Sequence, residues 1–392
     1  MRTLTVTRWT GPPVTDRPAT RGRWIWTLAG LATVGLLAWP VVGLISRAGN
    51  GGQGEFVTPT PTITRTVTVT QPVTSLSVES YGAPIQITAG PVHQVTVREA
   101  ISYGGPGQAP TVTADVSDRR LTLDAPACAS SGCSVGFTVI VPPAVEVTAE
   151  SDNGGIAVSG VAGANLDSGG GPVQASHING PLSVTSEDGG ITVSDVSAPS
   201  GTSLDSGGGP VQASHIHGPL TISSEDGGIT VSDVTAPGVN LDSGGGPVQV
   251  GRVNGPLTVT SEDGGVTVNG LTGDLEADTG GGPFAGDVSS GRASVLTEDG
   301  SVALTFASAP AYVFVDTGGG PAQLAFDQPP DTVMVSTENG SASLSVPGGP
   351  YAVTANSGGG GPSPTVNIPT SPTADHTLTV STEGGPLEIV PR

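Results

Sequence analysis

The segment LDSGGGPVQASHING, residues 166–180, recurs as LDSGGGPVQASHIHG at 204–218 and as LDSGGGPVQVGRVNG at 241–255. Runs of glycine begin at residues 169, 207, 244, 280, 318 and 358. A second motif, SEDGG, lies about halfway between them at residues 186, 224 and 261, and degenerate copies follow. An offset of 18 residues aligns Leu166 with Val184 and Val173 with Ile191. The repeating unit is therefore one coil of about 18–20 residues that occurs in two alternating forms.

Each coil holds two short runs rich in Val, Ile, Leu and Thr, in which apolar residues occupy every second position, and this alternation predicts β-strands. Units this short bury too little apolar surface to fold alone, so they must stack on their neighbours. We therefore expect an all-β fold, a parallel β-solenoid, preceded by one transmembrane helix. A Greek-key sandwich is the alternative, but the regular repetition disfavours it. From residue 145 to the C-terminus we expect 13 coils, a rod of about 60 Å at about 4.8 Å per coil.

Composition divides the chain into five parts. They are a cytoplasmic tail (1–23), a transmembrane signal anchor (24–46), a Gly/Pro/Thr-rich linker (47–65), atypical N-terminal β coils (66–144) and regular solenoid repeats (145–392). The stretch from Trp24 to Ile45 has 22 residues without a charge, which is about 33 Å of helix against a bilayer core of about 30 Å. Five arginines precede it and only Arg47 follows closely. The positive-inside rule then places the C-terminal domain outside the cell membrane. A cleaved signal peptide is the alternative, but the apolar run is longer than usual for one and the following ISRAGN is a poor match to a cleavage site.

The turns alternate between glycine and acid. The turn glycines are Gly169, Gly170, Gly207, Gly208, Gly244 and Gly245, and the acidic turns are Glu187, Asp188, Glu225, Asp226, Glu262 and Asp263. Glycine in alternate coils would double the spacing of the carboxylates to about 9.6 Å, close to the Debye length. It would also allow a positive φ at the corner. We therefore interpret these motifs as structural. Calcium at the acidic turns is the alternative, although they do not match the GGxGxD pattern of calcium repeats.

A charge column follows the turns, because the offset aligns one charged residue from each of five successive coils. Its members are His177, Asp195, His215, Asp233 and Arg252. Stacked opposite charges stabilise a sheet, so we interpret the column as structural. Metal binding is the alternative, but two histidines two coils apart would lie about 9.6 Å from each other.

Composition also limits the partners and the chemistry. The chain has a net charge of −21 and no lysine, so we expect no nucleic-acid partner, because phosphate binding needs a basic surface. The sequence contains no nucleophile motif, and the aromatic residues after residue 46 are scattered, with most phenylalanines after 280 at inward positions. We expect no enzyme activity and no cofactor. Cys128 and Cys133, in CASSGC, would lie outside the membrane, where a disulfide between them is expected.

The segments SLSVESYGAPIQITAG and SVGFTVIVPPAVEVTAESDNGGIAVSGVAG, with the recurring strand–S/T-x-x-G-x–strand unit, resemble the bacterial adhesin-like, toastrack-type domain of β-strand repeats, a family of unknown function. The resemblance covers residues from about 70 to 392. It implies an extracytoplasmic β-solenoid, often behind a membrane anchor, with no established catalytic residues. The lysine-free composition also resembles proteins of actinobacteria.

These observations favour a membrane-anchored cell-surface solenoid that acts as an adhesion or envelope-interaction module. Its partner would be the cell wall or a surface glycan or protein. The alternatives are the outer sensor arm of an envelope-stress system and a passive structural rod. We also expect that the last coil, LTVSTEGGPLEIVPR, leaves a sheet edge open through which copies could self-associate.

Overall fold

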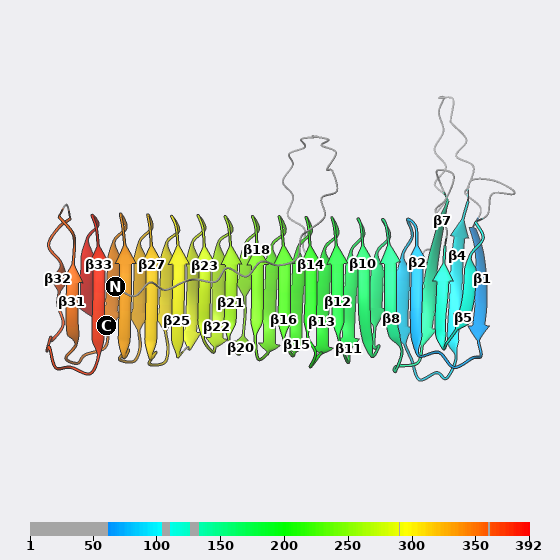
Figure 1. Cartoon of the computed structure of the whole chain (residues 1–392), viewed down its shortest axis with the longest axis horizontal. Coiled ribbons are helices and arrows are strands. Elements are labelled where there is room, and N and C mark those ends of the chain that lie inside the picture. The colour runs from blue at the N-terminus through cyan, green and yellow to red at the C-terminus, as the bar shows by residue number, and fades with distance from the viewer. Residues whose placement is uncertain (1–61, 104–109, 126–132, 290, 360) are drawn as a thin grey trace, which may run out of the picture. The chain divides into compact units, whose positions relative to one another are not determined.

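The computed structural model describes residues 62–103, 110–125, 133–289, 291–359 and 361–392, and the regular structure in these ranges is β-strand. Two sheets lie face to face along one solenoid (Figure 1). Each regular coil gives one strand to each sheet, because its two apolar runs are separated by a turn. The predicted parallel β-solenoid is confirmed, with coils of about 19 residues and 13 coils from β8 onward.

We call the 18-stranded sheet sheet A and the 16-stranded sheet sheet B. In spatial order, sheet A consists of β1 (Thr62–Val69), β4 (Val95–Ser102), β7 (Ser134–Val141), β3 (Ile85–Ala89), β9 (Ile156–Ser159), β11 (Val173–Ile178), β13 (Ile191–Ser197), β15 (Val211–His217), β17 (Ile229–Thr235), β19 (Val248–Val250) with β20 (Val253–Asn254), β22 (Val266–Thr272), β24 (Phe284–Ser289), β26 (Val302–Phe306), β28 (Ala322–Phe326), β30 (Ala342–Val346), β34 (Leu387–Pro391) and β32 (Thr365–Val366). Sheet B consists of β5 (Thr113–Ser117), β6 (Arg120–Asp124), β2 (Ser75–Ser80), β8 (Glu146–Ser151), β10 (Gly163–Ser168), β12 (Leu182–Ser186), β14 (Thr202–Ser206), β16 (Leu220–Ser224), β18 (Val239–Ser243), β21 (Leu257–Ser261), β23 (Leu275–Thr279), β25 (Arg292–Thr297), β27 (Tyr312–Thr317), β29 (Thr332–Thr337), β33 (Thr377–Thr382) and β31 (Ala352–Asn356).

The core lies between the two sheets and is built from columns of identical register. Leu166 pairs with Val184 in sheet B, and Val173 pairs with Ile191 in sheet A, as the 18-residue offset predicted. These side chains are at most 1% exposed, and burial of each is worth about 1.5–3 kcal/mol. Further along, Phe306 and Phe326 stack with their ring centroids 4.9 Å apart. The expectation that most phenylalanines after residue 280 face the core is therefore confirmed, and Phe314 is the exception at an outward position.

The N-terminal strands do not follow chain order. Leu76 of β2 pairs with both Leu121 of β6 and Val147 of β8, so the first coil lies between two later ones. Beyond it, β1, β4 and β5 pair antiparallel with their neighbours. The region from 66 to 144 therefore forms β coils as expected, but its outer strands are antiparallel. Strand β1 begins at Thr62, inside the segment interpreted as linker.

The C-terminal coil is inserted between two others. Leu378 of β33 pairs with Val333 of β29 on one side and with Val353 of β31 on the other. Strand β34 likewise lies between β30 and β32. The prediction that the last coil leaves its edge open is therefore wrong. The chain runs outward to form the terminal coil of β31 and β32 and then returns, so its last strands have neighbours on both sides.

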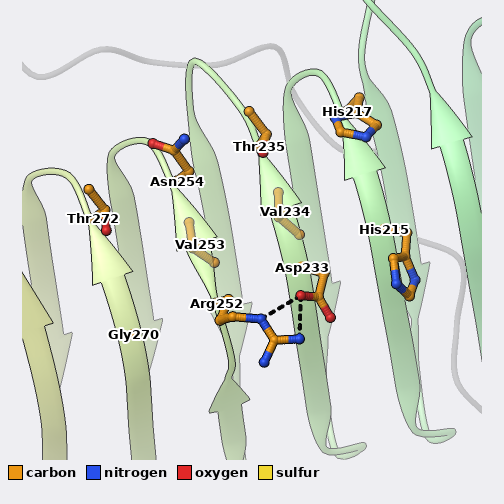
Figure 2. Close-up of a pocket in the computed structure, with 10 residues that line it drawn as sticks. All are labelled: His215, His217, Asp233, Val234, Thr235, Arg252, Val253, Asn254, Gly270 and Thr272. Atoms are coloured by element: carbon orange, nitrogen blue, oxygen red, sulfur yellow. Dashed lines mark hydrogen bonds and ion pairs between the residues drawn. The ribbon is translucent and has the colours of Figure 1, made fainter.

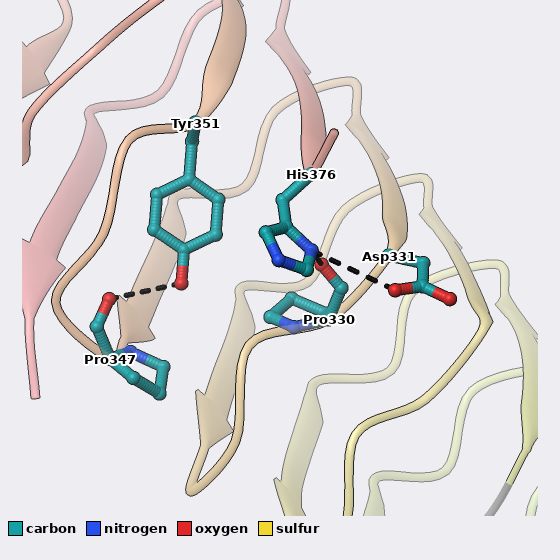
Figure 3. A network of polar contacts seen from close by, with 5 residues as sticks. All are labelled: Pro330, Asp331, Pro347, Tyr351 and His376. Carbon is teal, nitrogen blue, oxygen red and sulfur yellow. Dashed lines mark hydrogen bonds and ion pairs between the residues drawn. The ribbon is translucent and has the colours of Figure 1, made fainter. Parts of the chain in front are cut away.

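The segment in which the chain turns back, between β32 and β33, is stabilised by contacts around His376 (Figure 3). Its Nδ1 lies 2.9 Å from the Pro330 carbonyl oxygen and 3.7 Å from Asp331 Oδ1. Because a carbonyl oxygen can only accept, Nδ1 carries the proton. The ring of His376 lies 5.8 Å from that of Tyr351, a fully buried side chain whose hydroxyl donates to the Pro347 carbonyl oxygen at 2.9 Å. Burial raises the pKa of Tyr351, so this hydroxyl remains a donor at neutral pH.

The residues that the structure describes contain no helix long and apolar enough to cross a membrane. The predicted signal anchor, residues 24–46, lies outside the described residues and stays a prediction.

Candidate functional site

The turns from sheet B to sheet A stack in register along the solenoid. The backbone N–H of Glu187 donates to the Ser168 carbonyl, and that of Gly207 donates to the Ser186 carbonyl, both at 3.0 Å. The same bond recurs from Glu225 to Ser206. Glycine turns therefore alternate with acidic turns in the regular coils, as the sequence alignment gave. At the C-terminal end the inserted coil breaks this order, because the turn of Glu383 stacks directly on the turn of Glu338.

A buried hydroxyl closes most of these turns at the end of the sheet B strand; the exception is Ser186, whose hydroxyl is buried without a hydrogen-bond partner. The Ser206 hydroxyl donates to the Gly209 carbonyl at 2.7 Å, and the Thr317 hydroxyl donates to the Gly320 carbonyl at 2.6 Å. The same three-residue bond is made by Ser168, Ser224, Ser243, Ser261, Thr279, Thr297, Thr337 and Thr382. The S/T-x-x-G motif thus satisfies a buried carbonyl locally. The sequence displayed this motif, but not the bond that it makes.

The turn glycines are required for close approach and not for a positive φ. None of Gly169, Gly170, Gly207, Gly208, Gly244 and Gly245 has a positive φ, so that part of the prediction is wrong. A Cβ on Gly207 would lie 2.5 Å from the Glu187 carbonyl oxygen of the preceding turn, whereas one on Gly208 would meet nothing nearer than 3.8 Å. Side chains are therefore excluded from the first position of each glycine turn by the neighbouring backbone.

The last glycine of each glycine turn forms a stacked-glycine column with its counterparts in the acidic turns. A Cβ on any member would lie 2.0–2.4 Å from backbone of the member before it in the stack. The column starts at Gly154, and the members that follow it are Gly171, Gly189, Gly209, Gly227, Gly246, Gly264, Gly282, Gly300, Gly320, Gly340 and Gly385.

The alternation leaves open clefts over the glycine turns at Gly207 and Gly244. One cleft of about 370 Å³ lies between the turns of Glu187–Asp188 and Glu225–Asp226, with Asp205 among its lining residues. A second of about 440 Å³ lies between Glu225–Asp226 and Glu262–Asp263, with Asp242 in the same place. Among the described residues, no three His, Cys, Asp or Glu side chains are grouped closely enough to hold a metal ion. The clefts are thus repeated acidic hollows without a built cation site.

The charge column lies at a bend in the sheet A strands. His177, Asp195, His215 and Asp233 all have φ between 54° and 57°, a left-handed conformation that is unusual for residues other than glycine. Gly160 and Gly270 occupy the same position in other coils and also have a positive φ. Glycine at this position in some coils is the sequence signal that could have indicated the left-handed conformation. Each of the four residues bulges out of the strand, with its side chain directed away from the core.

Only part of this column forms ion pairs. Arg252 Nε donates to Asp233 Oδ1 at 2.7 Å, and His177 Nε2 lies 4.0 Å from Asp195 Oδ2. His215 and His217 line, together with Asp233 and Arg252, a shallow groove of about 500 Å³ on the outer face of sheet A (Figure 2). This groove presents imidazole, carboxylate, guanidinium and amide groups together.

Sheet B carries an exposed apolar patch near the C-terminal end. Leu296, Tyr312 and Met334 are 38–39% exposed on β25, β27 and β29, and Phe314 lies opposite Met334 at an outward position. The Tyr312 hydroxyl donates to the Met334 sulfur at 3.7 Å. The sequence showed these aromatic residues as scattered, because the coil register that brings them together was needed to see the patch.

The charge alternation fails at the N-terminal end, where acids occupy adjacent strands of sheet B. Glu79 pairs with Asp124 on one side and with Glu150 on the other, and Asp167 follows Glu150. Burial, and then the charges of Asp124 and Glu150, raise the pKa of Glu79. Like charges directly opposite each other destabilise a sheet.

We expect Glu79→Gln to stabilise the solenoid at neutral pH. The pKa of Glu79 is higher in the folded chain than in the unfolded chain. Glu79 therefore favours folding at pH values below its unfolded pKa, and this contribution is lost as the pH rises through its folded pKa. Urea unfolding at pH 7 should show a higher midpoint for the variant, and the difference should vanish near pH 3.5. The control is Glu276→Gln, whose neighbours Thr258 and Ser294 are uncharged. An equal gain in both variants would contradict the expectation.

Cys133 is disulfide-bonded. Its predicted partner, Cys128, lies outside the described residues, so the pairing itself stays a prediction.

No known family model matches the sequence, and no curated protein matches it. The solved structures that are similar over most of the chain include the following three. A "putative adhesin" of Parabacteroides distasonis is 11% identical with a TM-score of 0.30 and covers 84% of this chain and 98% of its own. A "putative adhesin" of Bacteroides fragilis is 12% identical with a TM-score of 0.27 and covers 85% of this chain and 97% of its own. A "putative cell adhesion protein" of Clostridium sporogenes is 8% identical with a TM-score of 0.19 and covers 85% of this chain and 100% of its own.

Proposed function

We propose that this protein is a membrane-anchored, extracytoplasmic β-solenoid that acts as a non-catalytic adhesion or envelope-interaction module. One observation carries the proposal: two acidic clefts of the same build lie two coils apart on one face, over the glycine turns of Gly207 and Gly244. A rod that presents identical groups at regular intervals can contact a polymer or a crowded surface at several points. Weak contacts then add up to strong attachment by effective concentration. The partner classes that fit are the cell wall and surface glycans or proteins.

The anchor part of the proposal rests on the uncharged stretch from Trp24 to Ile45 and on the arginines that precede it. With this anchor, the solenoid would stand outside the membrane, where its ligands are.

Co-sedimentation tests the function. Residues 58–392 form one compact unit, and this segment would be mixed with isolated cell envelope and with purified cell wall, with and without calcium. We expect saturable pelleting. Dependence on calcium would assign a binding role to the acidic turns. If no pelleting occurred under any of these conditions, the proposal would be wrong, and a sensor arm or a passive rod would remain.

The variant that tests the clefts removes four turn charges, Glu187→Gln, Asp188→Asn, Glu225→Gln and Asp226→Asn. Its matched control removes four exposed acids elsewhere, Glu146→Gln, Asp287→Asn, Asp375→Asn and Glu388→Gln. We expect weaker pelleting only for the first set. Equal effects would show that binding depends on overall charge and not on the clefts.

A further inference from the structure

The two sheets end at different places at the N-terminal end of the solenoid. Beyond β3, sheet A continues with β7, β4 and β1. Beyond β2, sheet B continues only with β6 and β5. Among the described residues, β1 pairs with β4 alone and β5 pairs with β6 alone. Sheet A therefore overhangs sheet B by one strand, and this strand lies at the edge (Figure 1).

The overhanging strand presents a core-type face without a covering layer. Its residues Ile63, Arg65, Val67 and Val69 lie opposite Ile101, Glu99, Val97 and Val95 of β4. The β4 residues are 1–8% exposed, so this is the inward face of sheet A. On β1, however, Ile63 is 45% exposed and Arg65 is exposed, whereas Val67 and Val69 are half-buried. An eight-residue edge strand with exposed apolar groups is a template for pairing with another chain.

A buried charge at the same place points to a missing partner. Glu99 is 1% exposed, and its Oε2 has no hydrogen-bond partner. A carboxylate oxygen that is buried without a partner is costly. The guanidinium of Arg65, directly opposite on β1, has the chemistry to satisfy it, yet the structure records no ion pair between the two. The end therefore holds an unsatisfied acid, an exposed base and exposed apolar side chains on one face.

The step formed by the overhang is complementary to itself. A rotation of 180° about an axis parallel to the strands exchanges the two sheets. It places β1 of a second copy in the position that sheet B lacks, beside β5. The inward faces of the two β1 strands then lie across the core from each other, at the sheet spacing of about 10 Å. We propose that two copies of this protein associate head to head through this end, so that the core continues from one solenoid into the other.

Charge favours this end over the sides of the rod. Residues 62–145 contain four arginines and five acidic residues, a net charge of −1, whereas residues 146–392 contain three arginines and 27 acidic residues, a net charge of −24. Contact between the regular coils of two copies brings like charges together, which costs free energy. The N-terminal end lacks this like-charge repulsion. In the dimer, the inward face on which Arg65 lies opposite Glu99 is covered by the second copy.

The test is the oligomeric state of the full chain in mild detergent, measured by sedimentation velocity. We expect a dimer for the natural sequence. Ile63→Asp should raise the dimer dissociation constant at least about 30-fold, as for a residue at the centre of an interface. The matched control is Ile140→Asp, because Ile140 is 42% exposed on β7 but points away from the core, and this variant should remain dimeric. Circular dichroism verifies that both variants are folded.

A second measurement locates the interface. Nitroxide labels are placed at Thr64 on β1 or at Asn356 on β31, and distances between copies are measured by electron resonance. We expect a short intermolecular distance from Thr64 and none from Asn356. A monomer at all concentrations, a short distance from Asn356, or a dimer that survives Ile63→Asp would each overturn the proposal.

Discussion

Gly246→Ala should destabilise the solenoid by about 3 kcal/mol, the upper range for forcing atoms into a packed interior. An added Cβ would lie 2.2 Å from the Gly227 carbonyl oxygen and 2.4 Å from its carbon. These are backbone atoms held by the ladder, so they cannot rotate away as a flexible side chain would. Urea unfolding followed by circular dichroism measures the change in free energy.

The control lies one residue earlier in the same turn. A Cβ on Gly245 meets nothing nearer than Asp226 Oδ1 at 4.0 Å. Gly245→Ala should therefore be neutral, or stabilising by up to about 1 kcal/mol through the lower entropy of the unfolded chain. If both variants lost the same stability, the explanation by stacked glycines would not hold.

Ending the chain after residue 376 should unfold the C-terminal coil that precedes the deletion. Removal of β33 and β34 takes away the strands that join β31 to β29 and β32 to β30. It also removes the buried side chains of Leu378 and Ile389. We expect residues 347–376 to lose protection in hydrogen exchange, while the central coils keep theirs, because stacked repeats depend mainly on their neighbours.

The matched truncation ends the chain after residue 346 and removes the whole C-terminal cap. It should leave a shorter solenoid that ends at β29 and β30 and contains no unfolded segment. Full protection of β31 in the first truncation would show that this strand does not depend on the inserted coil.

The regular coils could be predicted from the sequence because register there is set by local pattern. The alternation around Leu166 and Val173, with an 18-residue offset, was enough to place their partners in the next coil. The same offset located the acidic turns and the charge column. The close approach at Gly207 and the left-handed bend at His215 were missed, because backbone spacing between coils is not visible in one coil.

The ends of the rod could not be predicted because any coil has the same local pattern. The sequence of a strand such as β2 or β33 has the same pattern whether its coil lies at an end of the rod or between two other coils. Their insertion depends on which neighbours can cover a free edge, and that choice involves contacts far apart in the chain. The first residues of β1 were assigned to the linker for a related reason, since they have Thr at every second position and continue a Thr/Pro-rich segment.

The nesting of acidic turns against glycine turns has a consequence for how such a gene can change length. Gain or loss of one coil would bring two turns of the same kind together, either with carboxylates on adjacent strands or with two glycine turns side by side. Gain or loss of two coils preserves the alternation. The near-identical segments at 166–203 and 204–240 are each one such two-coil unit. Because strands at both ends are placed out of chain order, recombination is tolerated only in the middle of the rod. Related genes should therefore differ in length by multiples of about 37 codons.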